Sequence, residues 1–212
     1  MDKEVFRKHF DENLEKNFPA LSKYFDFDLE VFSEFNQLIF EINKCLLLEF
    51  NRASITLTNN LLERLLKLAL IYNETGIGPI PVENWNTIFA EPNQKYGSIP
   101  LGNSIEKCKK NGLITDHEKT VLFDTIRELM RNGFSHADSS KILADLPDHS
   151  PMYQGNLNNP TDLKEVSVNQ KVVPFLQAIQ MEEFAKENAK PYFDYIFKLV
   201  FRIEKRLIEK QK

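Results

Sequence analysis

Cysteine is scarce in this sequence, which has two copies, Cys45 and Cys108, far apart along the chain. Neither belongs to a paired metal-ligand spacing, which argues against a disulfide framework or a zinc site and favours a reducing compartment. No apolar run approaches the roughly 18 residues needed to cross a bilayer. The N-terminal stretch has mixed charge and lacks the apolar core of a secretory signal. We therefore expect a cytoplasmic protein without membrane contact.

A strong charge of either sign is also missing, since the formal net charge is −4. No global basic field therefore indicates nucleic-acid binding. Apolar residues, in contrast, make up 42% of the chain and include 17 phenylalanines. A chain of 212 residues with this composition can bury one sizeable core, so we expect a single globular domain over residues 1–212.

Apolar residues recur at helical spacing along most of the chain. One stripe includes Val31, Phe35 and Ile42, and a second long stripe runs through residues 61–72. No strand-like alternation is long enough to build a sheet. The pattern predicts an all-α fold, an up-down helical bundle with an extra N-terminal helix and long C-terminal helices over 169–212. Pro191 stands where it can start the last of these helices.

Turn and capping residues divide these helices. Residues 73–100 are rich in Gly, Pro and Asn and predict a long connection with a short helical turn around Trp85. Residues 146–168 predict a polar, proline-bearing loop. Gly112 is placed as a helix C-cap, and Thr115 with Glu118 forms a capping box that starts the next helix. That helix carries an apolar stripe, composed of Val121, Leu122, Ile126, Leu129 and Met130.

The helix leads into "RELMRNGFSHADSSK", which places Arg131 and His136 five positions apart. On an uninterrupted helix, residues at this spacing point in directions roughly 140° apart. Gly133 predicts a left-handed residue that ends the helix, and Ser135 a cap that begins the next one. Arg131 and His136 would then face one corner. A neutral imidazole can accept a proton, and a guanidinium can hold a phosphate, so this corner could serve phosphodiester cleavage.

Structural roles explain the same residues. Glu128, three positions before Arg131 on the same helix, could form a surface ion pair with it. His136 could simply fill a helix corner. Glu63 could pair with Lys67 four positions on, or with Asn59 four positions before. From local pattern alone, both the structural and the chemical interpretations stay open.

The hexapeptide "RNGFSH" resembles the signature of the HEPN superfamily of α-helical domains. This signature consists of an arginine, a polar residue, three variable residues and a histidine. The residues around the hexapeptide resemble these domains as well: "ASITLTNNLLERLLKLAL" is similar to the long second helix of such domains. "LGNSIEKCKKNGLITDHEKTVLFDTIRELMRNGFSHA" is similar to the motif helix and the helix and turn before it. The resemblance covers about residues 30–145, the core of the expected domain.

This resemblance implies a metal-independent endoribonuclease without a cofactor, in antiviral defence, abortive infection or a toxin system. Two copies of the motif would form a composite cleft in a homodimer. His136 would be the general acid or base, Arg131 would bind the scissile phosphate and stabilise its charge, and Asn132 would orient one of them or the phosphate. Glu63 would support Arg131. Attack by the ribose 2′-OH would leave a cyclic phosphate and restrict the substrate to RNA.

The resemblance leaves one alternative, because some HEPN domains are non-catalytic modules that bind RNA or a partner protein. The segments 73–100 and 146–168 are longer than a minimal domain needs. Either segment could cover the cleft, restrain activity or bind a regulatory partner protein.

Overall fold

The computed structural model of the chain describes residues 2–134, 139–144, 146–156 and 159–211. The fold is mainly α-helical, with one small antiparallel sheet. The elements, in chain order, are α1 (Lys3–Leu21), η1 (Ser22–Tyr24), η2 (Ser33–Phe35), α2 (Asn36–Leu47), α3 (Asn51–Thr75), η3 (Val82–Asn84), α4 (Trp85–Tyr96), α5 (Leu101–Lys110), α6 (Asp116–Thr120), η4 (Val121–Phe134), α7 (Ser139–Ile142), β1 (His149–Asn156), β2 (Asn159–Asn169) and α8 (Pro174–Lys210). The elements η1 to η3 are short 3-10 helices, whereas η4 is a π-helix.

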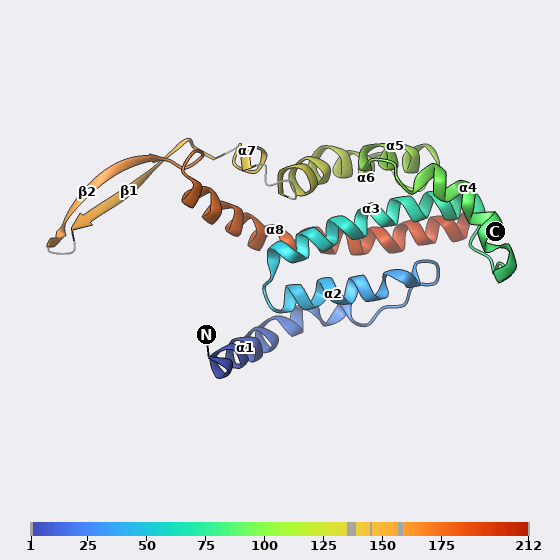
Figure 1. Cartoon of the computed structure of the whole chain (residues 1–212), viewed down its shortest axis with the longest axis horizontal. Coiled ribbons are helices and arrows are strands. Elements are labelled where there is room, and N and C mark those ends of the chain that lie inside the picture. The colour runs from blue at the N-terminus through green and yellow to red at the C-terminus, as the bar shows by residue number, and fades with distance from the viewer. Residues whose placement is uncertain (1, 135–138, 145, 157–158, 212) are drawn as a thin grey trace.

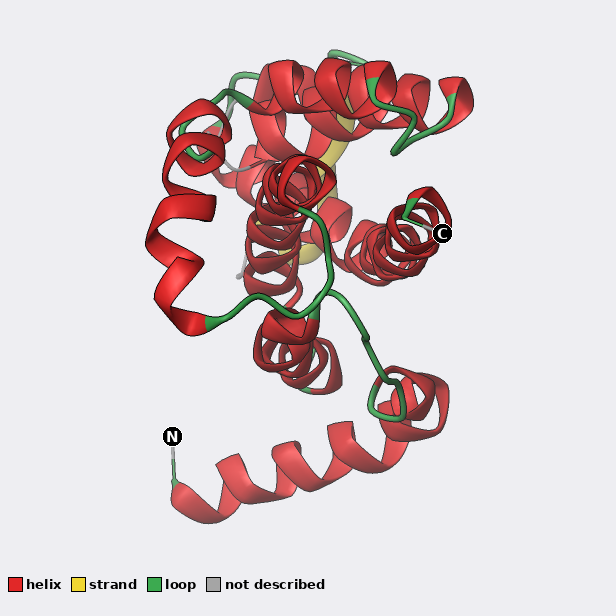
Figure 2. Cartoon of the chain, turned by 90° about the vertical axis from the view of Figure 1, so that its right-hand side faces the viewer, coloured by secondary structure: helices red, strands yellow, loops and turns green. Residues whose placement is uncertain are grey.

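Helix α3 is the central element of the fold. It runs beside α8 along the long axis of the molecule (Figure 1), and it also contacts α2, α4, α5 and η4. The end-on view shows these helices on different sides of α3 (Figure 2). A helix covered on several sides must carry apolar residues around most of its circumference, and α3 does.

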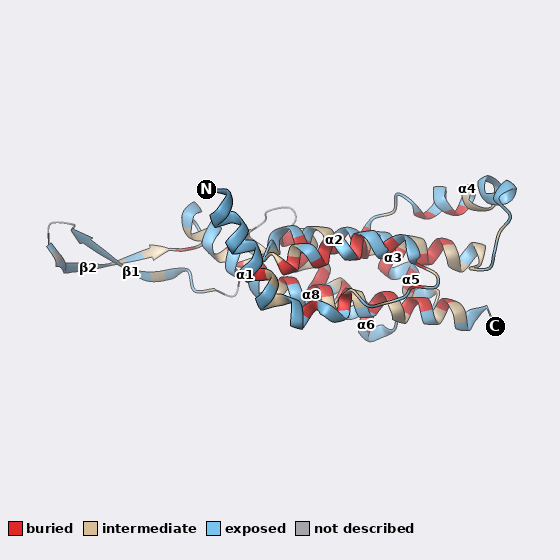
Figure 3. Cartoon of the chain, turned by 90° about the horizontal axis from the view of Figure 1, so that it is seen from below, coloured by how far each residue is buried: buried red, intermediate tan, exposed pale blue. Residues whose placement is uncertain are grey.

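Its buried apolar side chains are Ile55, Leu61, Leu62, Leu65, Leu66, Ala69, Leu70 and Ile71. Burial of each large aliphatic side chain contributes about 1.5–3 kcal/mol relative to exposure. Figure 3 shows the resulting band of buried residues where α2, α3 and α8 meet. The core thus lies along the length of α3.

Helix α8 is a single helix across Pro191, so the expectation that Pro191 starts a separate last helix was wrong. Proline inside a helix removes one backbone hydrogen bond and costs about 3 kcal/mol. The side chains that flank it offset this cost, because Ala189, Tyr192 and Phe193 are buried in the core. The helix instead begins with Pro174, which occupies the first turn. Tertiary packing therefore decides the course of this segment.

The segment predicted as a polar loop over 146–168 contains a β-hairpin, so the expectation of no sheet was also wrong. Strands β1 and β2 pair antiparallel, with Met152 opposite Val166 and Ser150 opposite Val168. The hairpin projects from one end of the molecule (Figure 1) and is mostly exposed (Figure 3). Because neither face is buried, neither strand needs the apolar alternation by which strands are recognised in sequence.

The other turn signals have mixed outcomes. Gly112 has φ of +64°, which confirms the predicted helix end. Thr115 and Glu118 form the predicted capping box with reciprocal hydrogen bonds. The connection 73–100, however, holds the 12-residue helix α4, which begins at Trp85 and extends well beyond a single turn.

Glu118 also joins this helix start to α8. Its carboxylate accepts from Arg206 Nη1 at 2.7 Å and from Arg202 Nε at 2.7 Å. Burial alone would raise the pKa of Glu118, but the hydrogen bonds from Arg206 and the Thr115 amide outweigh it and lower the pKa. The element that leads into η4 is therefore held to α8 by a charged residue in addition to apolar packing.

Across the described ranges, no helix combines the length and the apolar character that a membrane span requires.

We predict that the hairpin contributes little to the stability of the helical core, because none of its described residues belongs to that core. Replacing residues 151–167 with Asn-Gly should shift the melting temperature by about 2 °C or less, as for changes to exposed surface. Thermal melting followed by circular dichroism measures this. Leu65→Ala is the control, since truncation of this fully buried side chain should lower the free energy of unfolding by about 2–5 kcal/mol. A shortened hairpin as harmful as Leu65→Ala would contradict the prediction.

Candidate functional site

The "RNGFSH" motif begins in the last turn of the π-helix η4. This wide helix buries Leu122, Ile126, Met130 and Phe134, each four positions after the one before. The i→i+5 hydrogen bonding of a π-helix widens the turn, which fits a four-residue repeat. Long π-helices are rare, and shorter π segments occur frequently at functional sites. In its last turn, Arg131 reaches Glu63 of α3, and the Phe134 ring stacks on Phe184 of α8.

Gly133 lies inside η4 and does not end it. Its φ is not in the left-handed region, where the described residues are Glu49, Gly76 and Gly112. The expectation of a left-handed helix end at Gly133 was therefore wrong. Gly133 is buried, and a Cβ added there would lie 3.2 Å from Ile142 Cγ1 of α7. Glycine is used here for close approach between two elements, which requires no positive φ.

Arg131 pairs with Glu63 of α3. Its Nε donates to Glu63 Oε1 at 2.6 Å, and the two side chains are 31% and 29% exposed. Two structural pairings that local spacing left open, Glu128 with Arg131 and Glu63 with Lys67, do not form. Because about one third of the Arg131 side chain is exposed, a ligand can still reach it. The motif arginine is thus oriented by a carboxylate from another helix.

Glu128 joins three other residues around the motif. Lys141 Nζ donates to its Oε2 at 2.6 Å, while Arg127 Nη2 and Asn132 Nδ2 donate to its Oε1 at 2.7 and 3.3 Å. The hydrogen bonds from Lys141 and then Arg127 are the largest causes that lower the pKa of Glu128 to about 2. Glu128 therefore stays ionised and holds Asn132 and α7 in place.

A buried hydrogen-bonded chain ties the last turn of η4 to both long helices. Asn59 Nδ2 of α3 donates to the Met130 carbonyl at 2.9 Å, and Tyr192 of α8 donates to Asn59 Oδ1 at 2.7 Å. Burial, followed by the charge of Glu63, raises the pKa of Tyr192, so its hydroxyl remains a donor. Buried polar chains of this kind are costly to break, which makes the position of Arg131 rigid.

A cavity of about 460 Å³ opens beside Arg131. It is lined by Glu63, Lys67, Ser98, Ile99, Pro100, Leu101, Gly102, Asn103, Arg127, Arg131 and Asn132. Among these described residues, three side chains are cationic and one is anionic. This excess of positive charge in a recess suits an anionic ligand, and arginine in particular suits phosphate.

The site residues expected from sequence therefore divide into two groups. The structure brings Arg131, Asn132 and Glu63 together at this cavity. His136 lies outside the described residues, as does the predicted cap Ser135. Within the described ranges, no group of three or more His, Cys, Asp or Glu side chains is arranged to hold a metal ion.

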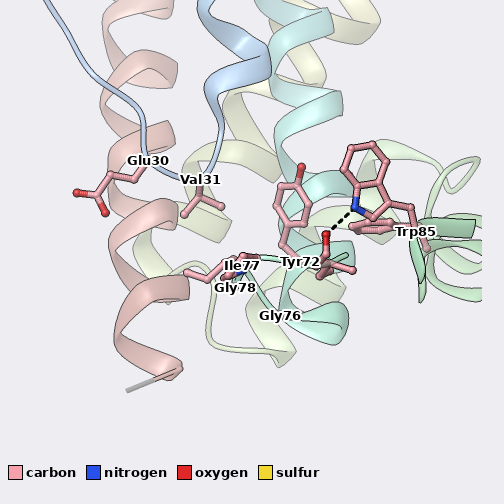
Figure 4. A pocket seen from close by; sticks show the side chains of 10 residues that line it. Glu30, Val31, Tyr72, Gly76, Ile77, Gly78 and Trp85 are labelled. Atoms are coloured by element: carbon pink, nitrogen blue, oxygen red, sulfur yellow. Dashed lines mark hydrogen bonds between the residues drawn. The ribbon is translucent and has the colours of Figure 1, made fainter. Parts of the chain in front are cut away.

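A second cavity, of about 480 Å³, lies where the end of α3 meets the start of α4 (Figure 4). Tyr72, Trp85 and Phe89 line it, and Trp85 Nε1 donates to the Ile80 carbonyl at 3.0 Å. Figure 4 shows the Glu30 carboxylate turned away from the rings. None of the described residues that line this cavity has a cationic side chain. It is therefore a poor candidate for phosphate, in contrast to the cavity at Arg131.

Sequence reasoning missed Arg127, Lys67 and the segment 98–103, which complete the cavity at Arg131. One signal was available, because Arg127 precedes Arg131 by four residues and could have been placed on the same helix face. The contribution of residues 98–103 depends on how α5 packs on α3, which no local pattern reveals.

Comparison of the chain with protein-family models, with curated proteins and with solved structures gives no match.

Replacing Gly133 with alanine should loosen the contact between η4 and α7. The new Cβ would lie 3.2 Å from Ile142 Cγ1 and 3.3 Å from the Glu128 carbonyl oxygen, closer than ordinary packing. We expect a loss of about 1–3 kcal/mol in the free energy of unfolding, as in other overpacked sites. Urea denaturation of Gly133→Ala measures it. Gly78→Ala is the matched control, because no atom lies within 4 Å of a Cβ there. Equal stability of the two variants would refute the close contact.

The ionisation of Glu128 gives a pH prediction. The native pKa of Glu128, about 2, lies below its usual value of about 4.3. The hydrogen bonds to the ionised carboxylate therefore stabilise the fold fully only above a pH of about 4.3. The stabilisation is lost as the pH falls toward about 2. A carbon-detected NMR titration should show this midpoint, and Lys141→Met should raise it. Lys110→Met, at the exposed end of α5, should leave it unchanged. An unaltered midpoint in Lys141→Met would show that Lys141 does not hold Glu128.

Proposed function

We propose that this chain is a metal-independent endoribonuclease of the HEPN type, with the catalytic motif Arg131, Asn132 and His136. The proposal includes a homodimer with a composite cleft, an up-down bundle of the HEPN type and a cytoplasmic role in antiviral defence or a toxin system. The resemblance of "RNGFSH" and the helices around it is the source of this assignment. The observation that carries it is the cavity of about 460 Å³, which Arg131 and Asn132 line together with further cations.

The arrangement of Arg131 suits phosphate chemistry in two respects. Its Nε is engaged by Glu63 at 2.6 Å, which orients the plane of the guanidinium without burying it. The buried chain through Asn59 and Tyr192 holds the backbone at Met130. A donor held in place before the reaction stabilises developing charge better than a mobile one, because no reorganisation is needed.

In the proposed reaction, His136 accepts the proton of the ribose 2′-OH as that oxygen attacks the adjacent phosphorus. The bond from phosphorus to the 5′ oxygen of the next nucleotide breaks, and this oxygen receives a proton from an acid in the cleft. Arg131 stabilises the negative charge on the phosphoryl oxygens, and Asn132 orients the phosphate. The products are a 2′,3′-cyclic phosphate and a free 5′-OH.

A non-catalytic module that binds RNA or a partner protein is the second candidate. The short Arg131–Glu63 ion pair favours it, because an arginine held by a carboxylate also serves a structural role. The two candidates differ in one measurable property: the binding module holds RNA intact.

Cleavage of RNA by the purified protein in EDTA tests the proposal. His136→Ala should lower the rate by about 10²–10⁴-fold through loss of proton transfer, and Arg131→Ala by about 10²–10³-fold through loss of charge stabilisation. RNA with a 2′-deoxy group at the cleavage position should stay intact.

His149→Ala in strand β1 is the control for histidine replacement, and circular dichroism verifies folding of each variant. Cleavage at the wild-type rate by both His136→Ala and Arg131→Ala would refute the proposed site. RNA binding without cleavage would favour the non-catalytic module.

A further inference from the structure

The cavity at Arg131 is lined by side chains outside the motif as well, and Lys67 is one of them. Lys67 is half-buried on α3, one helical turn after Glu63. In the part of the chain that the structure describes, its side chain makes no ion pair and no hydrogen bond. Glu63, the one carboxylate among the described residues that line the cavity, is engaged by Arg131 instead. The charge of Lys67 therefore remains available to a ligand in the cavity.

Arg127 also lines the cavity and is held on two sides. Its Nε and Nη2 donate to Glu128 Oε1 at 3.1 and 2.7 Å, and its guanidinium carbon lies 3.8 Å from the centre of the Phe123 ring. The remaining nitrogen, Nη1, points toward α5, where a Cβ on Gly102 would lie 2.9 Å from it. Only glycine at this position leaves room for the guanidinium where it stands.

The beginning of α5 adds donors to these two cations. Pro100 precedes the helix and provides no side-chain cap. The first backbone N–H groups of a helix have no partner within the helix, and residues 101–103, which carry them here, line the cavity. These amides support anion binding beside Lys67 and Arg127, but the two side chains carry the charge.

We infer that Lys67 and Arg127 bind the RNA phosphate next to the one held by Arg131, an inference that rests on the proposed function. Arg127 and Arg131 stand four residues apart on η4, and helix neighbours at this spacing are about 5–6 Å apart at Cβ. This separation is similar to that between successive phosphates of a nucleic-acid strand. The substrate is therefore a strand with backbone on both sides of the cut, and recognition of the second phosphate is independent of base sequence.

Binding of a fluorescent 2′-O-methyl RNA of about 12 nucleotides tests this inference, because the probe lacks the attacking hydroxyl and its length falls within common single-strand site sizes. Anisotropy is measured at several salt concentrations. Each lost phosphate contact should lower the slope of log K against log salt by about 0.7. We expect this reduction, with several-fold weaker binding, for Lys67→Met and for Arg127→Met.

Two further variants separate charge from folding. Arg127→Lys keeps the charge and should retain most of the slope. Gly102→Ala should leave the fold intact, because its Cβ would be in ordinary contact with Phe123 at 3.5 Å and too close only to Arg127 Nη1, at 2.9 Å, the far end of a long side chain. It should weaken binding by displacing that guanidinium. Lys110→Met, at the other end of α5, is the matched control and should bind as the wild type does.

His136→Ala distinguishes the two proposals, since it should abolish cleavage and leave the slope unchanged. If the wild type cuts RNA but Lys67→Met and Arg127→Met keep its slope, the second-phosphate site is wrong and the nuclease proposal stands. If the wild type cuts no RNA while both variants still lose slope, the phosphate site stands and the nuclease proposal fails. Absence of salt-dependent binding by the wild type would overturn the inference.

Discussion

Burial of α3 on nearly all sides is the constraint on which the rest of the structure depends. It contacts α2, α8, α4, α5 and η4, which lie on different sides of it. A helix so enclosed can expose polar side chains only where its neighbours separate. Glu63 and Lys67 occupy such a place, between η4 and the start of α5. The same packing that forms the core therefore also forms the cavity and places charge inside it.

The exchange of ion-pair partners shows how this packing sets the site. By spacing along their helices, Glu128 could form an ion pair with Arg131, and Glu63 could form one with Lys67. In the folded chain, Arg131 pairs with Glu63, while Glu128 pairs with Arg127 and Lys141. Each observed pair joins different elements, except Arg127 with Glu128. The exchange leaves Lys67 without a partner among the described residues and makes the cavity electropositive.

Rigid and exposed parts of the molecule are clearly divided. The buried chain from Tyr192 through Asn59 to Met130 ties the motif helix to α3 and α8. The hairpin β1–β2, in contrast, lies outside the core and exposes most of its side chains. A candidate site at the end of η4 thus stands on the rigid part, close to the point where the chain leaves the core for the hairpin.

The sequence by itself determined the features that depend on neighbours along the chain. Helical stripes such as Leu61–Leu65 predicted the core helices, and Gly112 and the Thr115–Glu118 box predicted where helices end and begin. Arg131 and Asn132 were singled out by the motif, and Glu63 by the resemblance of its helix. These signals are local, because a stripe or a cap is set by residues within one or two turns.

Only the tertiary structure decided the features that depend on distant segments. Pro191 continues a helix because core packing offsets its local cost, and Gly133 serves a contact with α7 in place of a helix end. The hairpin carries no burial pattern because neither face is covered. The cavity combines side chains from α3, η4 and the start of α5, which are separated by tens of residues in the chain. Their convergence follows from how apolar faces pack around α3, a property of the whole fold.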